Sequence, residues 1–126
     1  MSSADDIRAT VEEYVRRWNA SDGDAVAELF DEHATVADPV DGEPHQGRAD
    51  IAAFFTSTFT DGMDATLSLT GPVRVAGPHA AFPMQVTIDL GDQTGRLDII
   101  DTMVFGDDGR ISAMRAYWDA AAMVIE

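Results

Sequence analysis

The stretch of sequence that decides the fold is Arg96-Leu97-Asp98-Ile99-Ile100-Asp101-Thr102-Met103-Val104-Phe105. Alternate residues of a strand point to opposite faces of its sheet. One face of this stretch carries Leu97, Ile99, Asp101, Met103 and Phe105. The other carries Arg96, Asp98, Ile100, Thr102 and Val104. This alternation predicts a strand with one packed face, and it sets the carboxyl group of Asp101 in the middle of that face.

An ionised and unpaired Asp101 would cost several kcal/mol on such a face, so it must pair with a cation or take up a proton. If the turn from Gly106 to Gly109 sets Phe105 opposite Arg110, the ladder gives these pairs: Asp101 with Met114, Ile99 with Ala116, Leu97 with Trp118, and Ile100 with Arg115. Arg115, the obvious cation, then points to the other side of the sheet. The sequence therefore predicts a protonated Asp101 that donates a hydrogen bond in a ligand pocket. The alternative is another register, with Asp101 half-exposed or paired.

The chain from residue 64 onward favours antiparallel strands joined by tight turns. The predicted turns lie at Gly71-Pro72, Gly77-Pro78, Gly91-Asp92 and Gly106 to Gly109. A second alternation predicts another strand with one packed face, formed by Phe82, Met84, Val86, Ile88 and Leu90.

The first 60 residues favour helices. Ser3 and Asp6 have the spacing of a capping box, and a helix over residues 4–20 follows. Its apolar stripe consists of Ile7, Val11, Tyr14, Val15 and Trp18. After it we expect a short helix with Val26, Leu29 and Phe30, a strand over 35–38, a loop over 41–47 and a helix over 49–59. Helices followed by strands favour one α+β domain over residues 1–126, with three helices covering one face of a curved sheet.

The composition excludes several kinds of function. With 23 acidic and 8 basic residues the net charge is -15, which disfavours nucleic acid and anionic membranes as partners. None of the basic residues is lysine, which excludes a Schiff-base lysine and a phosphate-loop lysine. The absence of cysteine excludes disulfides and thiolate ligands. No signal-peptide pattern or apolar run of about 20 residues is present, so we expect a cytoplasmic protein.

The histidines do not predict a metal site. His33, His45 and His79 lie in turn-like, acidic stretches without a helical pair of ligands. We therefore expect surface histidines and no bound metal.

Two further residues are candidates for chemistry. Tyr14 puts a hydroxyl group on the apolar stripe of the first helix, where a buried hydroxyl needs a partner. Asp38 ends the predicted short strand, and Pro39 favours an extended conformation there. Each also fits a plainer interpretation, as a core tyrosine or a turn aspartate.

Tyr14, Asp38 and Asp101, in this order, resemble the site residues of the ketosteroid isomerases, members of the nuclear-transport-factor-2-like superfamily of cone-shaped α+β domains. The similarity covers nearly the whole chain. It is most specific in the stretches Ala34 to Val40, Leu69 to Arg74, Asp98 to Asp101 and Met114 to Trp118. The superfamily fold alone would say little about function, since it hosts many activities.

The resemblance implies a steroid delta-isomerase that moves the β,γ double bond of a 3-ketosteroid into conjugation. It implies that Asp38 is the general base, that Tyr14 and Asp101 donate to the oxyanion, and that no cofactor is needed. It also implies a substrate pocket lined by Phe55, Phe82, Met84, Met114 and Trp118. A homodimer is expected, because the family pairs through its sheet. The second sheet face also keeps the apolar residues Ile100, Val104, Ile111 and Tyr117.

The chain departs from the family pattern at Phe30 and Phe55, where some members carry tyrosines that hydrogen-bond to the oxyanion tyrosine. We expect this to alter the rate or the pKa of Tyr14 without abolishing the chemistry. One alternative is a polyketide cyclase-like enzyme, against which the combination of Tyr14 and Asp101 argues. Another is a non-catalytic module that binds a hydrophobic ligand, which has no reason to keep both a base and a buried acid.

Overall fold

The protein is described by a computed structural model, which covers residues 2–60 and 64–126. Its helices are α1 (Ala4–Asn19), α2 (Gly23–Ala27) and α3 (Arg48–Thr60), with a short 3-10 helix η1 (Ala120–Ala122) near the C-terminus. Its strands are β1 (Phe30–Ala37), β2 (His45–Gln46), β3 (Asp64–Leu69), β4 (Arg74–Ala76), β5 (His79–Asp89), β6 (Thr94–Phe105), β7 (Ile111–Tyr117) and β8 (Val124–Ile125).

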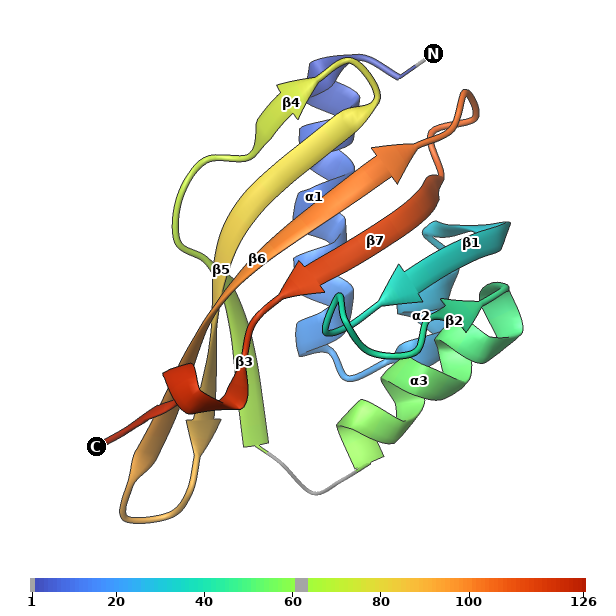
Figure 1. Cartoon of the computed structure of the whole chain (residues 1–126). Helices are drawn as coiled ribbons and strands as arrows, with labels where there is room; N and C mark the ends of the chain where they lie inside the picture. Colours follow the sequence, from blue (N-terminus) through green and yellow to red (C-terminus); the bar gives the residue numbers. More distant parts are fainter. Residues whose placement is uncertain (1, 61–63) are drawn as a thin grey trace.

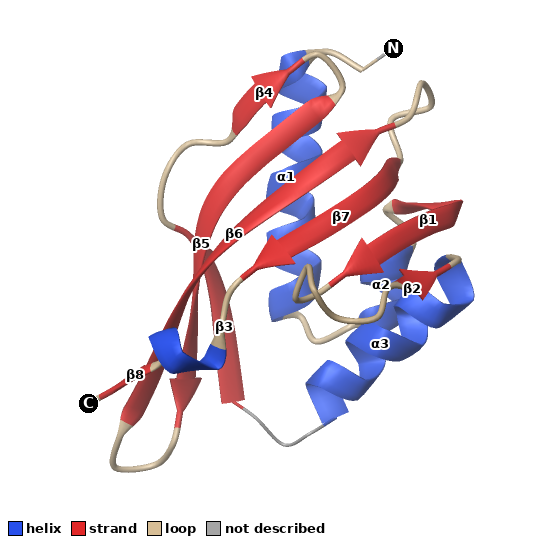
Figure 2. Cartoon of the chain, in the orientation of Figure 1, coloured by secondary structure: helices blue, strands red, loops and turns tan. Residues whose placement is uncertain are grey.

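The strands form one curved sheet in the order β2-β1-β7-β6-β5-β3, with β4 added beside β5 and β8 beside β6. β1 and β7 run parallel, whereas the other neighbours are antiparallel. Figure 1 and Figure 2 show α1 behind the long strands and α3 beside β1 and β2. This confirms the predicted α+β class, with three N-terminal helices on the concave side of a mixed sheet.

The first helix begins as the sequence predicts. The Ser3 side chain accepts from the Asp6 amide and the Asp6 carboxylate accepts from the Ser3 amide, which forms the complete capping box. At the other end, the Asn19 side chain donates to the Leu67 carbonyl and accepts from the Leu67 amide, both at 2.8 Å. These two bonds fix α1 against β3, and its buried face points into the core.

The segment after α2 differs from the prediction. The short helix ends at Ala27, and Phe30 begins an eight-residue strand in place of the brief strand over 35–38. Phe30 pairs with Ile111 of the parallel neighbour β7. This contact across 81 positions (111 minus 30) leaves no local signal in the sequence. The predicted loop over 41–47 holds the two-residue strand β2.

The register between β6 and β7 differs by two residues from the prediction. Asp101 lies opposite Ala116 rather than Met114, because the turn is longer and a bulge separates the pair Val104–Ala113 from the pair Phe105–Ile111. A shift of two residues keeps the side chains of residues 113–117 on their predicted faces. Asp101 therefore faces the concave side, and Arg115 faces away from it.

Two predicted exposures are wrong. The bulge pairs Ile111 with Phe105 on the packed face, where Ile111 is 0% exposed, so it does not belong to the outer face. Leu90 lies beyond the end of β5 and is 48% exposed, so it does not continue the packed face of that strand. Among the described residues, no helix combines the length and the apolar character needed to span a membrane.

Candidate active site

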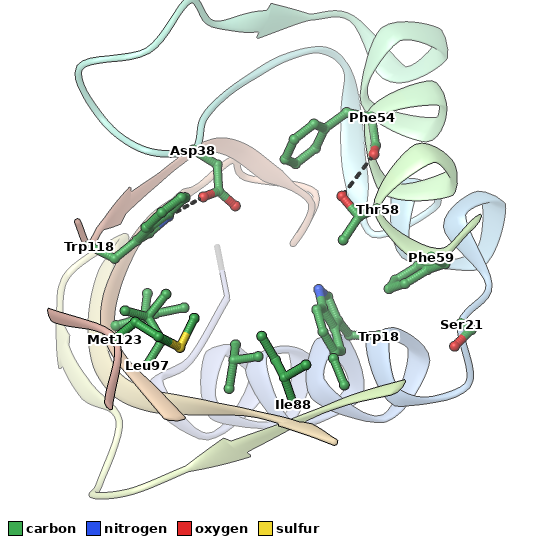
Figure 3. A pocket seen from close by; sticks show the side chains of 13 residues that line it. Trp18, Ser21, Asp38, Phe54, Thr58, Phe59, Ile88, Leu97, Trp118 and Met123 are labelled. Atoms are coloured by element: carbon green, nitrogen blue, oxygen red, sulfur yellow. Dashed lines mark hydrogen bonds between the residues drawn. The ribbon is translucent and has the colours of Figure 1, made fainter. Parts of the chain in front are cut away.

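A cavity lies between the concave face of the sheet and the helices α1 and α3 (Figure 3). Its outer chamber has a volume of about 340 Å³, a size typical of small-molecule sites. The wall is mostly apolar and consists of Trp18, Ser21, Asp38, Phe54, Thr58, Phe59, Ala65, Val86, Ile88, Leu97, Ile99, Trp118 and Met123. Since none of these side chains is basic, the chamber suits a neutral, largely apolar ligand.

A smaller inner chamber of about 70 Å³ continues the cavity toward the core. The two chambers share six wall residues, namely Trp18, Asp38, Phe54, Thr58, Val86 and Ile99. Tyr14 and Asp101 line only the inner chamber. The cavity thus brings the three predicted chemical residues together, with Asp38 at the junction of the chambers.

Asp101 is the buried acid of the inner chamber. It is 2% exposed, and its Oδ1 atom has no hydrogen-bond partner within the described part of the chain. Burial raises the pKa of Asp101 well above its ordinary value, and the nearby charge of Asp38 raises it further. A neutral carboxyl group is a hydrogen-bond donor, and this one lines the inner chamber.

Tyr14 brings a second buried polar side chain to the inner chamber. It is 2% exposed, and burial raises the pKa of its hydroxyl well above its ordinary value, with contributions from Asp101 and Asp38. The Phe55 ring meets the Tyr14 ring edge-on at 6.1 Å, and Phe30 lies 6.1 Å beyond Phe55. At the two positions that depart from the family pattern, the rings of Phe55 and Phe30 therefore offer Tyr14 no hydrogen bond.

Asp38 directly follows the last residue of β1, and Trp118 follows the last residue of its neighbour β7. The Trp118 indole Nε1 donates to Asp38 Oδ1 at 2.6 Å. Burial raises the pKa of Asp38 above its ordinary value, while the Trp118 hydrogen bond and His45 act in the opposite direction. Asp38 is therefore the carboxyl group of this pair whose ionised form receives support.

The predicted lining residues divide into two groups. Phe55 and Met84 line the inner chamber and Trp118 lines the outer one, beside Asp38. Phe82 and Met114 are each 1% exposed and belong to the core cluster, but they are not among the wall residues of either chamber. Phe82 is the β5 neighbour of Asp101, so it packs beside the acid.

Several wall residues were not predicted. Leu97 and Ile99 share the face of β6 that carries Asp101, so the alternation already contained a signal for them. Met123 follows η1, and no periodicity in the sequence pointed to it.

His45 was expected at the surface, yet its ring stacks on Phe54, with ring centres 4.3 Å apart. Among the described residues, no group of three His, Cys, Asp or Glu side chains is placed to hold a metal ion.

Fold and site together define a class of protein: a small α+β domain in which Tyr14, Asp38 and Asp101 line an apolar cavity between the helices and a concave sheet. Residues 11–114 match the SnoaL-like domain. The chain belongs to this family.

The comparison with a curated relative supports the predicted resemblance. The chain is 37% identical over 120 residues to the steroid Delta-isomerase of Nocardioides simplex, and the alignment covers 95% of each chain. This near full-length likeness confirms the resemblance to the ketosteroid isomerases.

Two other relatives have a different chemistry. The epoxide hydrolase LasB of Streptomyces lasalocidi is 30% identical over 112 residues, which cover 84% of this chain and 39% of that protein. The solved structure of SalBIII, an epoxide hydrolase/cyclase-like enzyme in pyran ring formation of salinomycin, has a TM-score of 0.87. It is 26% identical, with complete coverage of both chains.

Asp101→Asn is expected to change how stability depends on pH. Because the pKa of Asp101 is raised in the folded chain, folding binds a proton between the ordinary carboxyl pKa and the folded-state pKa. Below the ordinary carboxyl pKa this proton contributes its full stabilising free energy. As the pH rises from there to the folded-state pKa, about 1.4 kcal/mol is lost per pH unit. Asparagine does not titrate, so the variant should gain stability relative to the parent as the pH rises. Urea unfolding at about pH 5 and about pH 7 measures this, and equal pH slopes would contradict a raised Asp101 pKa.

Proposed function

We propose that the protein is a steroid delta-isomerase that moves the β,γ double bond of a 3-ketosteroid into conjugation with its carbonyl group. The observation that carries the proposal is the unpartnered Oδ1 of Asp101, which lines the inner chamber together with Tyr14. Two neutral donors at the closed end of an apolar cavity suit one oxygen atom that becomes negative during a reaction. The near full-length likeness to a steroid Delta-isomerase supports an enzyme of this class.

In the proposed reaction, Asp38 acts as the general base. Its carboxylate takes the proton from the carbon between the carbonyl group and the double bond, and the electron pair moves onto the carbonyl oxygen as a dienolate forms. The protonated Asp38 then returns the proton to the γ carbon, and the dienolate collapses to the conjugated enone. Atoms and electrons balance without any co-reactant, so we propose no cofactor for the reaction.

Tyr14 and Asp101 stabilise the dienolate oxygen by hydrogen bonds. Donors held in a cavity from which water is excluded act strongly on developing charge, and one such donor is typically worth about 3 kcal/mol. The two carboxyl groups take different roles because their surroundings differ. Asp38 accepts the Trp118 hydrogen bond, whereas Asp101 has an oxygen without a partner and is disfavoured as an ion by burial and by Asp38.

A second candidate is the opening of an epoxide, with or without closure of an ether ring. The likeness to LasB and to SalBIII favours it, since an epoxide oxygen also needs an acid and the attacking hydroxyl group needs a base. Asp101 would protonate the epoxide and Asp38 would activate the nucleophile. The isomerase is the stronger proposal, because Tyr14 adds a second donor beside Asp101 and a dienolate oxygen uses both.

The two candidates are separated by their products. The protein is incubated with a β,γ-unsaturated 3-ketosteroid and, separately, with an epoxy alcohol of similar size. Ultraviolet absorbance follows the enone and mass spectrometry follows the opened epoxide. We expect catalysed formation of the enone and an unchanged epoxide. Catalysed opening of the epoxide without enone formation would replace the isomerase with the second candidate.

Trp118→Phe is expected to shift the acid limb of the pH profile of kcat/KM. Removing the indole N–H takes away a hydrogen bond that favours ionised Asp38, so the pKa of Asp38 should rise. Asp38 then becomes protonated, and inactive as a base, at a pH that is higher by roughly one unit, the effect of losing a charge-assisted hydrogen bond. Tyr117→Phe, next in the chain but on the exposed face, is the control. An unchanged acid limb in Trp118→Phe would show that the Trp118 hydrogen bond does not set the pKa of Asp38.

The homodimer stays a prediction. Ile100 and Tyr117 are 53% and 46% exposed on the outer face of the sheet, which supports a partner there. Ile111 is buried and cannot contribute to such a surface.

Phe82 and Met114 were predicted to line the substrate pocket. Their proposed role is to support the chamber walls from behind, since both belong to the core cluster.

A further inference from the structure

Two tryptophan indoles line the cavity, and their N–H groups are used differently. Trp118 Nε1 donates to Asp38, whereas Trp18 Nε1 takes part in no hydrogen bond between residues of the ranges 2–60 and 64–126. Figure 3 shows the nitrogen of Trp18 on the part of its ring that faces the open cavity. An indole N–H is only a donor, and a largely buried one usually finds an acceptor. The acceptor for Trp18 therefore has to come from the ligand or the solvent.

The Trp18 ring is held by a row of aromatic side chains. It meets Phe59 edge-on, with ring centres 5.3 Å apart and planes at 85°. Phe59 stacks on Phe55 at 6.5 Å, and Phe55 in turn contacts Tyr14. A donor whose orientation is fixed before binding loses little freedom when a ligand arrives. The row thus presents the Trp18 N–H and the Tyr14 hydroxyl as a fixed pair.

The pair has a defined spacing. Tyr14 and Trp18 are four residues apart on one face of α1, which corresponds to about 6 Å along the helix axis. Tyr14 lines only the inner chamber, while Trp18 lines both chambers. When the carbonyl oxygen of a ligand reaches Tyr14, the rest of its skeleton must therefore lie beside the Trp18 N–H.

Two polar side chains that line both chambers already have hydrogen-bond partners. The Thr58 hydroxyl donates to the Phe54 carbonyl at 3.1 Å, and Asp38 Oδ1 accepts from Trp118. The remaining neighbours in both chambers, Val86 and Ile99, are apolar. A ligand that covers the Trp18 N–H without offering an acceptor loses the hydrogen bond that water supplied.

We propose that Trp18 is a specificity-determining donor that selects ligands with a second acceptor oxygen, a ketone or a hydroxyl group, on the apolar skeleton beyond the reacting carbonyl. The nature of the skeleton rests on the proposed function, whereas the donor itself rests on the geometry of Trp18. The site selects a neutral oxygen, because none of the described residues that line the two chambers is basic.

Matched pairs of conjugated 3-ketosteroids test the proposal. The members of each pair differ by one ketone or hydroxyl oxygen on rings B to D, and their Kd values are measured with the parent protein and with Trp18→Phe. We expect at least one pair in which the parent prefers the oxygenated member by about threefold to tenfold, and in which Trp18→Phe loses this preference. The ratio within a pair cancels the packing that phenylalanine loses for both members.

Indole NMR signals give a second readout that packing alone would not produce. The chain has two tryptophans, so Trp118→Phe identifies the signal of Trp18. The Trp18 N–H signal should move downfield with the oxygenated member and not with its partner. The proposal is overturned if no pair shows a preference that depends on Trp18, or if no ligand of the panel binds. Ligands that bind with this preference but are never isomerised would refute the proposed function and leave the donor standing.

Discussion

Asp38→Asn is expected to lower kcat for the transposition of the double bond by about 10²-fold to 10⁴-fold, the contribution of a positioned general base. Asparagine keeps the shape of the side chain and can still contact Trp118, but it cannot accept a proton from carbon. Binding should change much less than kcat, because the cavity wall is otherwise intact. Initial rates of enone formation at saturating substrate measure the loss.

Asp41→Asn is the matched control for this variant. Asp41 lies three residues further along the same loop, is exposed and lines neither chamber. The control removes the same charge from the same segment and should keep the parent rate. If Asp38→Asn retained more than about a tenth of the activity of this control, general-base catalysis by Asp38 would be refuted.

Asp101→Leu is expected to lower kcat by about 10²-fold to 10³-fold, the effect of removing one oxyanion donor. Leucine fits the apolar character of its surroundings, so the variant should fold and even resist unfolding better near neutral pH. Asp101→Asn keeps a neutral N–H donor and should lose less activity than the leucine variant. We thus expect kcat to fall in the order parent, Asp101→Asn, Asp101→Leu. This order follows from the strength of the hydrogen-bond donor rather than from the charge of the side chain.

Asp98→Asn and Asp98→Leu are the controls for the two Asp101 variants. Asp98 is on the same strand but on the outer face, where its Oδ1 accepts a hydrogen bond from Gln85 at 3.0 Å. Both controls should keep the parent kcat. An Asp101→Leu variant as active as Asp98→Leu would remove Asp101 from the reaction and leave Tyr14 as the single donor.

The face of Asp101 could be predicted because strand periodicity depends only on neighbouring residues. Observed exposure alternates along the whole of β6, as the stretch 96–105 indicated. The pairing was wrong by two residues, yet a shift of two leaves each side chain on the same face. The capping box of α1 was predictable for the same reason, since its two partners lie three residues apart.

Features built from distant contacts could not be predicted in this way. The parallel pairing of β1 with β7 extends the first strand, and the bulge beside Phe105 buries Ile111. Each depends on segments that are far apart in the chain or on one extra residue in a strand. The cavity wall shows the same division, because Leu97 and Ile99 follow from alternation whereas Met123 reaches the chamber only through the C-terminal segment.

The resemblance grouped Tyr14, Asp38 and Asp101, and the surroundings of the two carboxyl groups support the different roles that we propose for them. The carboxylate that accepts the Trp118 hydrogen bond is Asp38, and the carboxyl group with an unpartnered oxygen is Asp101. A strand pattern can place an acid on a face, but the partners that decide its protonation come from other elements.

The rate of enone formation from a β,γ-unsaturated 3-ketosteroid tests the central claim most directly. The assay follows ultraviolet absorbance with the parent protein, with Asp38→Asn and without protein. We expect a rate that is proportional to the concentration of the parent protein, saturates with substrate and exceeds that of Asp38→Asn by at least about 10²-fold. A parent rate no faster than that of Asp38→Asn, with the steroid bound, would contradict it.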